Sequence, residues 1–224
     1  MYIAGLNLSI TESQALNGLA CASLAGSFYL AWPGANFKTR AEEGGGKVTH
    51  RPSGKKGLYI TVAHGLALFV PAAVFMTAIP TNKFIAPEWL GQCALPEVSP
   101  PIHYAIRIGS SISLWVAGGI VFLSFKHLDT QWSYIGVRDT YGVVDTGPYK
   151  VVRHPMYSCA LLTMLGTAGA FWNWIPIAAS GLLAGLFAYK IPLEENDILT
   201  HQYMGSDYTE YKEKVPSRVI PYIW

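Results

Sequence analysis

The sequence predicts an all-α integral membrane protein with about five transmembrane helices. Of its 224 residues, 51% are hydrophobic and only 13% are charged, whereas a soluble domain usually carries about a quarter charged residues. The uncharged residues are grouped in long runs, and Lys and Arg are grouped in particular loops between these runs. Much of the surface is therefore expected to face lipid rather than water.

Four runs are long and apolar enough to cross a bilayer, which takes about 20 mainly apolar residues in a helix. They are residues 13–37, 57–82, 102–125 (interrupted only by Arg107) and 156–189. The last run has 34 residues, too many for one straight span. Near its middle, residues 171–176 contain two Trp residues suited to a membrane interface and a Pro suited to a helix start. We therefore expect a tight helical hairpin (spans 4 and 5), which gives five spans in all.

The distribution of Lys and Arg predicts the orientation of these spans. The second loop is poor in positive charge, with Lys83 beside Glu88 and Glu97, whereas the first loop, the third loop and the C-terminal tail are rich in it. By the positive-inside rule the three basic segments are cytoplasmic and the N-terminus is on the outer side. The basic residues are Lys38, Arg40, Lys47, Arg51, Lys55 and Lys56 in the first loop, Lys126, Arg138, Lys150 and Arg153 in the third, and Lys190, Lys212, Lys214 and Arg218 in the tail.

Two loops carry further expectations. The basic cytoplasmic loop 38–56 contains a Gly triplet and a Pro-Ser-Gly-Lys-Lys stretch, so it is predicted to be a flexible linker lying against anionic headgroups. It has neither the spacing of a phosphate-binding loop nor a strand before it. The outer loop 83–101 is acidic and Pro-rich, and is expected to cap the bundle. We expect one structural domain, with spans 1 to 3 in residues 1–118 and spans 4 and 5 with the cytoplasmic tail in 119–224.

The charge and the cysteines bear on the possible partners. A net charge of +2 argues against nucleic acid as the partner. Cys21, Cys93 and Cys159 are widely spaced and form no Cys/His cluster, so we expect no metal site and no disulfide framework. Small apolar packing is the expected role of these cysteines.

Polar and aromatic residues whose side chains could take part in binding or catalysis flank the predicted hairpin. Because both ends of an antiparallel helix pair emerge on one face of the membrane, residues about 40 positions apart can converge there. Ionisable residues that face a helix bundle at the membrane boundary are candidates for function. Simpler roles exist for single residues, such as membrane anchoring or an i,i+4 salt bridge between Lys190 and Glu194. The converging residues are Arg153, His154, Tyr157, Lys190, Glu194 and Glu195.

The motifs Gly147-Pro148-Tyr149, Arg153-His154-Pro155-Met156-Tyr157 and Glu194-Glu195 stand in this order along the chain. The stretch Tyr208-Thr209-Glu210-Tyr211-Lys212-Glu213-Lys214-Val215-Pro216 follows them. Together they resemble the isoprenylcysteine carboxyl methyltransferases, part of a wider group of membrane methyltransferases that includes phospholipid N-methyltransferases. The resemblance covers roughly residues 119–224, and the combination of motifs is more specific than the RHPxY run alone.

The resemblance implies S-adenosylmethionine bound at the cytoplasmic end of the last helices, as the cofactor of an O-methyltransferase. Its substrate would be the C-terminal carboxylate of a prenylated cysteine, in a protein or a small molecule, reached from the lipid bilayer. Lys190 would hold this carboxylate, in a catalytic set with Glu194 and Arg153. The cofactor would contact Tyr141, Gly142, Val143, Val144, Tyr149, His154, Pro155, Met156, Tyr157, Glu194 and Glu195. In a eukaryotic source the resemblance implies the endoplasmic reticulum membrane with a lumenal N-terminus and a cytoplasmic C-terminus, and in a prokaryotic source the plasma membrane.

The chemistry leaves other acceptors open. A carboxylate has a pKa near 4 and is ionised at neutral pH, so it needs no general base, whereas an amine must first lose a proton. Two departures from the family pattern concern acceptor handling: Lys190 replaces the usual Arg, and a further family arginine has no clear counterpart around Ser124. A third departure, Cys159 where the family usually has Gly, concerns the approach of the helix to the cofactor. Alternatives are a small-molecule acid or a phospholipid amine as acceptor, membrane sterol reduction with a nicotinamide cofactor, and a non-catalytic membrane scaffold.

Overall fold

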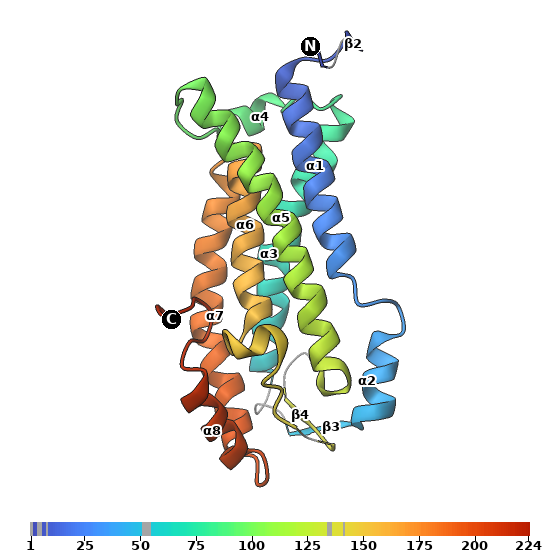
Figure 1. Cartoon of the computed structure of the whole chain (residues 1–224), viewed down its shortest axis with the longest axis vertical. Helices are drawn as coiled ribbons and strands as arrows, with labels where there is room; N and C mark the ends of the chain where they lie inside the picture. Colours follow the sequence, from blue (N-terminus) through green and yellow to red (C-terminus); the bar gives the residue numbers. More distant parts are fainter. Residues whose placement is uncertain (1, 4–5, 8, 51–54, 134–135, 141) are drawn as a thin grey trace.

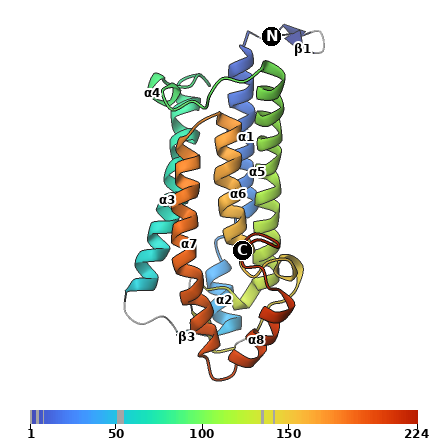
Figure 2. The same cartoon turned by 90° about the vertical axis from the view of Figure 1, so that its left-hand side faces the viewer.

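The structure is a computed structural model that describes residues 2–3, 6–7, 9–50, 55–133, 136–140 and 142–224. Five long helices run along its longest axis, and successive ones run in opposite directions (Figures 1 and 2). They are α1 (Glu12–Ala31), α3 (Lys56–Thr81), α5 (Pro100–Leu128), α6 (Pro155–Phe171) and α7 (Ile175–Leu199). The N-terminus therefore lies at the end of the bundle opposite to the loops that follow α1 and α5.

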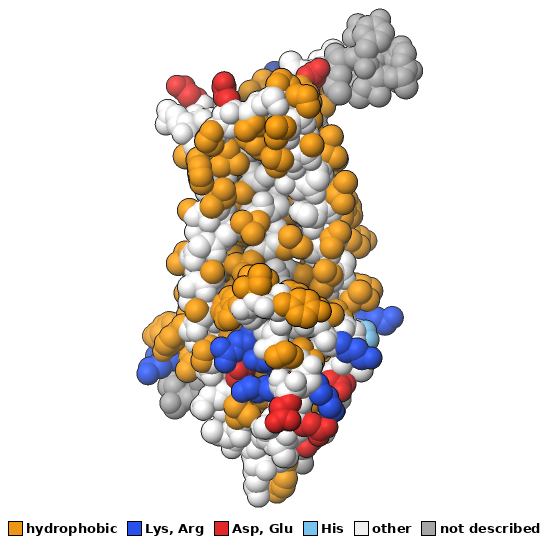
Figure 3. Space-filling view, turned by 60° about the vertical axis from the view of Figure 1, so that its left-hand side comes forward, with side chains coloured by type: hydrophobic (Ala, Val, Ile, Leu, Met, Phe, Trp, Pro, Cys, Tyr) orange, Lys and Arg blue, Asp and Glu red, His pale blue; other side chains and the backbone are white. Residues whose placement is uncertain are grey.

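The bundle has the surface of a membrane protein. On the face shown in Figure 3, hydrophobic side chains are spread over the middle of the bundle, whereas Lys, Arg, Asp and Glu gather toward its ends and are densest at the end that carries α8 (Gly205–Lys214). Among the described residues, three helices are long and apolar enough to cross a membrane: α3, α5 with the turn η1 (Asp129–Gln131), and α7. The chain is thus an α-helical membrane protein, as the composition predicts.

The five-span topology and its orientation stay predictions. Helix α6 has 17 residues, which at 1.5 Å per residue span about 25 Å, less than the roughly 30 Å of a bilayer core. Helix α1 has 20 residues but buries the polar side chains of Asn17, Ser23 and Ser27 against its neighbours. Both helices nevertheless pack lengthwise against α5.

Small residues allow α5 to approach its neighbours closely, as is typical where helices associate in lipid. A Cβ atom on Gly118 of α5 would lie 2.6 Å from the carbonyl oxygen of Ser27 on α1. On the other side of α5, a Cβ atom on Gly169 of α6 would lie 2.0 Å from the Ser110 hydroxyl oxygen. These contacts hold α1, α5 and α6 together as a tightly packed layer.

Replacing Gly169 by Ala is expected to loosen this layer. The added methyl group clashes with Ser110 on α5, and overpacking of this kind costs about 1–3 kcal/mol of unfolding free energy. The matched control is Gly185→Ala on α7, where nothing lies within 4 Å of the added atom. Thermal unfolding in detergent should show a lower midpoint for Gly169→Ala only. Equal midpoints for the two variants would contradict the close packing of α5 on α6.

The buried charge in the third span has a structural explanation. Arg107 is 5% exposed, and its Nε donates to the carbonyl oxygen of Ala170, in the last turn of α6, at 2.8 Å. Its Nη2 donates to Asn17 Oδ1 at 2.6 Å. A guanidinium at a helix C-terminus also interacts favourably with the helix dipole. Arg107 therefore ties the C-terminal end of α6 to α1.

The predicted hairpin is present, with α6 and α7 joined by residues 172–174. Trp172 ends α6 in the left-handed conformation at φ +56°, and Pro176 lies in the first turn of α7. The loop that contains α4 (Glu88–Gly91) covers this turn. Trp174 N–H donates to the Cys93 carbonyl at 2.8 Å, and the Asn173 side chain donates to the Leu90 carbonyl at 2.8 Å. The loop between α3 and α5 therefore closes the end of the bundle that carries the hairpin turn.

The prediction that loop 38–56 is a flexible linker is wrong for its described part. Residues Phe37–Gly45 form α2, and β3 (Val48–His50) pairs antiparallel with β4 (Val137–Arg138). The reason is apolar contact with the loop after α5, since the Phe37 ring packs against Phe125 at 5.1 Å and Trp132 at 5.3 Å. Residues 51–54 lie outside the described ranges. Two further short strands, β1 (Tyr2–Ile3) and β2 (Leu6–Asn7), pair near the N-terminus.

Candidate functional site

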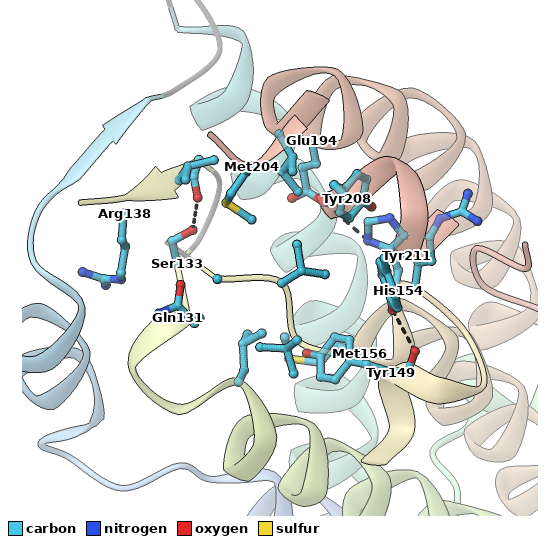
Figure 4. Close-up of a pocket in the computed structure, with 18 of the residues that line it drawn as sticks. Gln131, Ser133, Arg138, Tyr149, His154, Met156, Glu194, Met204, Tyr208 and Tyr211 are labelled. Atoms are coloured by element: carbon cyan, nitrogen blue, oxygen red, sulfur yellow. Dashed lines mark hydrogen bonds and ion pairs between the residues drawn. The ribbon is translucent and has the colours of Figure 1, made fainter. Parts of the chain in front are cut away.

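A cavity of about 200 Å³ lies at the end of the bundle opposite the N-terminus. Its walls come from the end of α5, the segment around β4, the turn η2 (Gly147–Lys150), the start of α6, the end of α7 and α8. Figure 4 shows Glu194, His154 and Tyr208 on one side of the cavity and Gln131 and Ser133 on the opposite side. The cavity therefore joins segments that are far apart in the sequence.

Glu194 forms part of the cavity wall because α7 continues ten residues beyond the apolar run that ends at Tyr189. The Tyr157 hydroxyl donates to its two carboxylate oxygens at 2.7 and 2.9 Å. Lys190 Nζ lies 3.4 Å from Glu194 Oε1, as an i,i+4 pair, and His154 Nδ1 lies 3.8 Å from Oε2. An ionised carboxylate accepts up to about four hydrogen bonds. Glu194, with 13% of its side chain exposed, thus keeps acceptor capacity toward the cavity.

Glu195 has a different environment, although it is adjacent in sequence. Its side chain is 3% exposed, and Arg153 Nε lies 2.8 Å from its Oε1. Arg218 donates to its Oε2 from Nη2 at 3.0 Å and from Nε at 3.2 Å. His154 Nε2 lies 3.3 Å from Oε1, and its backbone N–H donates to the Arg218 carbonyl. Glu195 therefore lies behind the cavity wall and links α7 to the start of α6 and to the tail.

The C-terminal tail supplies the hydrogen-bond partners for the segment that leads into α6. Arg153 Nη1 donates to the carbonyl oxygens of Val215 and Pro216, each at 2.7 Å, and Arg153 N–H donates to the Ser217 carbonyl at 3.0 Å. Pro155 begins α6 and needs no partner because it has no N–H group. The Arg-His-Pro run thus holds the tail against the start of the helix.

Tyr149 contributes a buried hydroxyl to the cavity wall. Its Oη is buried and has no hydrogen-bond partner in the described part of the chain. Burial raises the pKa of the Tyr149 hydroxyl well above its usual range, so the group stays protonated and can donate. The Tyr211 hydroxyl donates to the Tyr149 carbonyl at 2.7 Å and fixes the turn. An unsatisfied buried hydroxyl is costly, which is a reason to expect a polar ligand group beside it.

Gly147 is required at the start of this turn. Its φ is +58°, and an added Cβ atom would lie 2.4 Å from the ring of His127. The His127 Nδ1 is 2.9 Å from the Thr146 hydroxyl, so the ring is held in place. The Gly-Pro-Tyr motif therefore places Tyr149 in the cavity wall by a turn that a larger residue cannot adopt.

The structure brings most of the predicted site residues together. Those that line the cavity are Gly142, Val143, Val144, Tyr149, Arg153, His154, Pro155, Met156, Tyr157 and Glu194. Glu195 and Lys190 do not line it, and Lys190 is 1% exposed. Tyr141 lies outside the described residues. Cys159, at the position where Gly is usual in the family, is buried on α6.

Ten lining residues were not predicted as site residues. They are Leu128, Gln131, Ser133, Gly136, Val137, Arg138, Ile198, Met204, Tyr208 and Tyr211. The two tyrosines belong to the C-terminal motif, so the sequence contained a signal for them, and burial raises the pKa of both hydroxyls. Val137 and Arg138 had no such signal, because only the pairing of β4 with β3 shows how their segment is held beside the cavity.

Comparison with known proteins gives a consistent result. Residues 106–206 match the family model described as phospholipid methyltransferase. The chain is 36% identical over 99 residues to protein-S-isoprenylcysteine O-methyltransferase B of Arabidopsis thaliana, a match that covers 43% of this chain and 46% of that protein. It is 34% identical over 90 residues to a probable protein-S-isoprenylcysteine O-methyltransferase of Oryza sativa subsp. japonica, covering 40% and 46%.

A third relative has a different printed name. The cobalt-zinc-cadmium resistance protein CzcN of Cupriavidus metallidurans is 30% identical over 97 residues, covering 42% of this chain and 43% of that protein. The chain thus matches less than half the length of these curated relatives. The matched part contains the Arg-His-Pro run and the Glu pair, and the predicted resemblance to the isoprenylcysteine carboxyl methyltransferases is confirmed.

Proposed function

We propose that this chain is an S-adenosylmethionine-dependent methyltransferase that methylates the C-terminal carboxylate of a prenylated cysteine. The observation that carries the proposal is the single cavity that joins residues 142–144, Tyr149, residues 154–157 and Glu194. These segments are up to about 50 positions apart in sequence and are the ones in which the resemblance places the cofactor. The names of the plant relatives support a prenylcysteine carboxylate as the acceptor.

The cavity suits the chemistry of S-adenosylmethionine. Glu194 offers a carboxylate for an ammonium or ribose hydroxyl group, and the unpartnered Tyr149 hydroxyl offers a donor. Val143, Val144 and Met156 provide apolar surface for an adenine ring. The positive end of the α6 dipole, at the wall of the cavity, favours the methionine carboxylate. When bound, the cofactor supplies a methyl group on a sulfonium cation.

The protein has little covalent chemistry to perform in this reaction. The acceptor carboxylate is ionised at neutral pH, so no residue of the chain would have to remove a proton from it before methyl transfer. The chain contributes alignment of the two reactants and exclusion of water. Lys190 is the residue proposed to hold the acceptor carboxylate, from a buried position beside Glu194.

Arg153 and Glu195 are proposed to act as positioning residues rather than as direct contacts. Glu195 is bound by two arginines and by His154, so it orients the imidazole that faces the cavity. Arg153 donates hydrogen bonds from its Nε to Glu195 and from its Nη1 to carbonyl groups of the tail. The cofactor contact predicted for the Glu pair would then be made by Glu194.

The membrane arrangement is part of the proposal. Five spans with an outer N-terminus would put the cavity, α8 and the basic residues on the cytoplasmic side. The prenyl chain of the acceptor would enter from the bilayer between helices. In a eukaryotic cell the proposed location is the endoplasmic reticulum membrane.

A phospholipid amine is the second candidate acceptor, because the matched family model is described as phospholipid methyltransferase. An amine has to be deprotonated before it attacks, and the tyrosines of the cavity wall are poor bases because burial keeps Tyr149, Tyr208 and Tyr211 protonated. The acceptor carboxylate has no such requirement. His154 and Glu194 also line the cavity and are groups that can accept a proton, so the preference for the carboxylate rests on the names of the plant relatives.

The test is transfer of labelled methyl from S-adenosylmethionine by the purified full chain. N-acetyl-S-farnesylcysteine and phosphatidylethanolamine serve as alternative acceptors, and Lys190→Met is compared with the wild type. We expect transfer to farnesylcysteine only, and retention of cofactor binding with loss of transfer in the variant. Transfer to the phospholipid instead would overturn the acceptor assignment. A folded wild-type protein that does not bind S-adenosylmethionine would overturn the methyltransferase proposal.

A further inference from the structure

A histidine in the first half of the chain lies next to the proposed acceptor residue. His64 is on α3, and its Nδ1 lies 3.5 Å from Lys190 Nζ on α7. Its ring centroid lies 5.7 Å from that of Phe187 and 6.0 Å from that of Tyr157. Residue 64 precedes the matched region, which begins at residue 106. An ionisable residue inside a membrane helix is a candidate for function, and the residue that it contacts indicates which function.

The contacts of the Lys190 ammonium indicate the role of the His64 imidazole beside it. An ammonium group has three N–H donors and no acceptor. One points to Glu194 at 3.4 Å and one to His64 at 3.5 Å, and the group lies 5.1 Å from the centroid of the Tyr157 ring. No third hydrogen-bond acceptor is present within the described ranges. Two partners on different helices therefore orient the ammonium and leave one N–H for a further anion.

The geometry also defines the state of His64. An N–H of the ammonium requires the lone pair of Nδ1, so the imidazole is neutral with its proton on Nε2. The ring is packed between aromatic side chains, and it is part-buried rather than sealed in the core. The neutral imidazole of His64 is thus an uncharged hydrogen-bond partner for Lys190, and Glu194 is its charged partner. A second carboxylate in place of His64 would cancel the positive charge of Lys190, which is proposed to bind the acceptor carboxylate.

A second polar group lies on the same side of α3. Thr61 is one turn before His64, and residues three apart share a helix face. Its Oγ1 is buried and has no hydrogen-bond partner among the described residues. In a helix such a hydroxyl usually donates to the carbonyl four residues earlier, as Thr77 does to Ala73 at 2.7 Å. The face of α3 that carries His64 therefore also carries a buried hydroxyl that lacks a hydrogen-bond partner among the described residues.

We propose that His64 is a positioning residue that orients the Lys190 ammonium toward the acceptor carboxylate. This inference rests on the proposed function and deepens it, because it assigns part of the acceptor subsite to α3. Helices α3 and α7 pack against each other, and their junction then forms the acceptor side of the site, while the cofactor side is built from the matched region. Selectivity for a carboxylate acceptor depends on this junction.

The test compares His64→Leu, which removes the acceptor nitrogen at similar volume, with His64→Asn, whose side-chain amide oxygen can occupy the place of Nδ1. His103→Leu serves as the matched control, since His103 packs against Trp172 at the hairpin turn. The readouts are binding of N-acetyl-S-farnesylcysteine in the presence of S-adenosylhomocysteine, binding of S-adenosylhomocysteine alone, and the KM for each reactant. Thermal unfolding of each variant shows whether it is folded.

We expect His64→Leu to weaken acceptor binding and raise the acceptor KM at least tenfold, the size of one lost hydrogen bond to a charged group. Cofactor binding should be unchanged, and His64→Asn should recover most of the acceptor affinity. Unchanged acceptor affinity in folded His64→Leu would overturn the inference, and so would an equal loss of cofactor affinity or failure of His64→Asn to recover. If the wild type itself transferred no methyl group, the proposed function would fail instead.

Discussion

Replacing Glu195 by Gln is expected to cost about 3–5 kcal/mol of unfolding free energy, the typical effect of breaking a buried ion pair by removing one partner. The amide keeps the shape of the side chain but not its charge. Arg153, 7% exposed, would be left without its counter-charge, and Arg218 would lose both of its hydrogen bonds to a carboxylate. The start of α6 and the tail should separate from α7, because this carboxylate joins all three.

Thermal or denaturant unfolding in detergent measures this effect. The matched control is Glu210→Gln on α8, where the carboxylate pairs with Lys214 at 2.7 Å but both side chains are largely exposed. Exposed pairs of this kind contribute little to stability, so the unfolding midpoint of the control should equal that of the wild type. If Glu195→Gln unfolded at the wild-type midpoint as well, Glu195 would not hold the three segments together.

Replacing Glu194 by Gln is expected to weaken binding of S-adenosylhomocysteine about 10- to 100-fold. The estimate follows from the contribution of one charge-assisted hydrogen bond, roughly 1.5–3 kcal/mol. Calorimetry on the purified protein measures it directly. The single variant also leaves Lys190 buried without its counter-charge, so a loss of binding on its own could reflect a disturbed fold.

The double variant Glu194→Gln with Lys190→Met separates the two effects. It removes both charges, so neither is left buried without its counter-charge, and it should unfold closer to the wild-type midpoint than Glu194→Gln alone. Cofactor binding should stay weak in it. Recovery of wild-type binding in the double variant would show that Glu194 acts only by pairing with Lys190 and does not contact the cofactor.

Local sequence patterns were sufficient to predict the long helices of this protein and the convergence of residues from both ends of the hairpin. Apolar runs at residues 57–82 and 102–125 correspond to α3 and α5, because a bilayer requires length and apolarity, and both can be counted along the chain. The hairpin followed from Trp and Pro near residue 174, since these residues have strong positional preferences at interfaces and helix starts. An antiparallel hairpin then brings Arg153 and Glu194 to one end whatever the details of packing.

Only the tertiary structure decided the different environments of residues that are adjacent in sequence. Glu194 and Glu195 are equivalent in sequence, but successive residues of a helix point about 100° apart, so one lines the cavity and the other is bound by two arginines. Loop 38–56 was predicted to be flexible because its composition is polar and Gly-rich. Its Phe37 finds aromatic partners about 90 positions away, a contact that local pattern does not reveal.

The same limit applies to His64. As one histidine in an apolar run, it has no motif around it, and only the packing of α3 on α7 places it beside Lys190. The sequence by itself determined where the long apolar helices lie and that the two ends of the hairpin converge, because both follow from hydrophobicity and turn residues along the chain. Which side chains meet across helices was decided by close packing of the folded bundle, since such contacts depend on the relative rotation and spacing of helices that are distant in sequence.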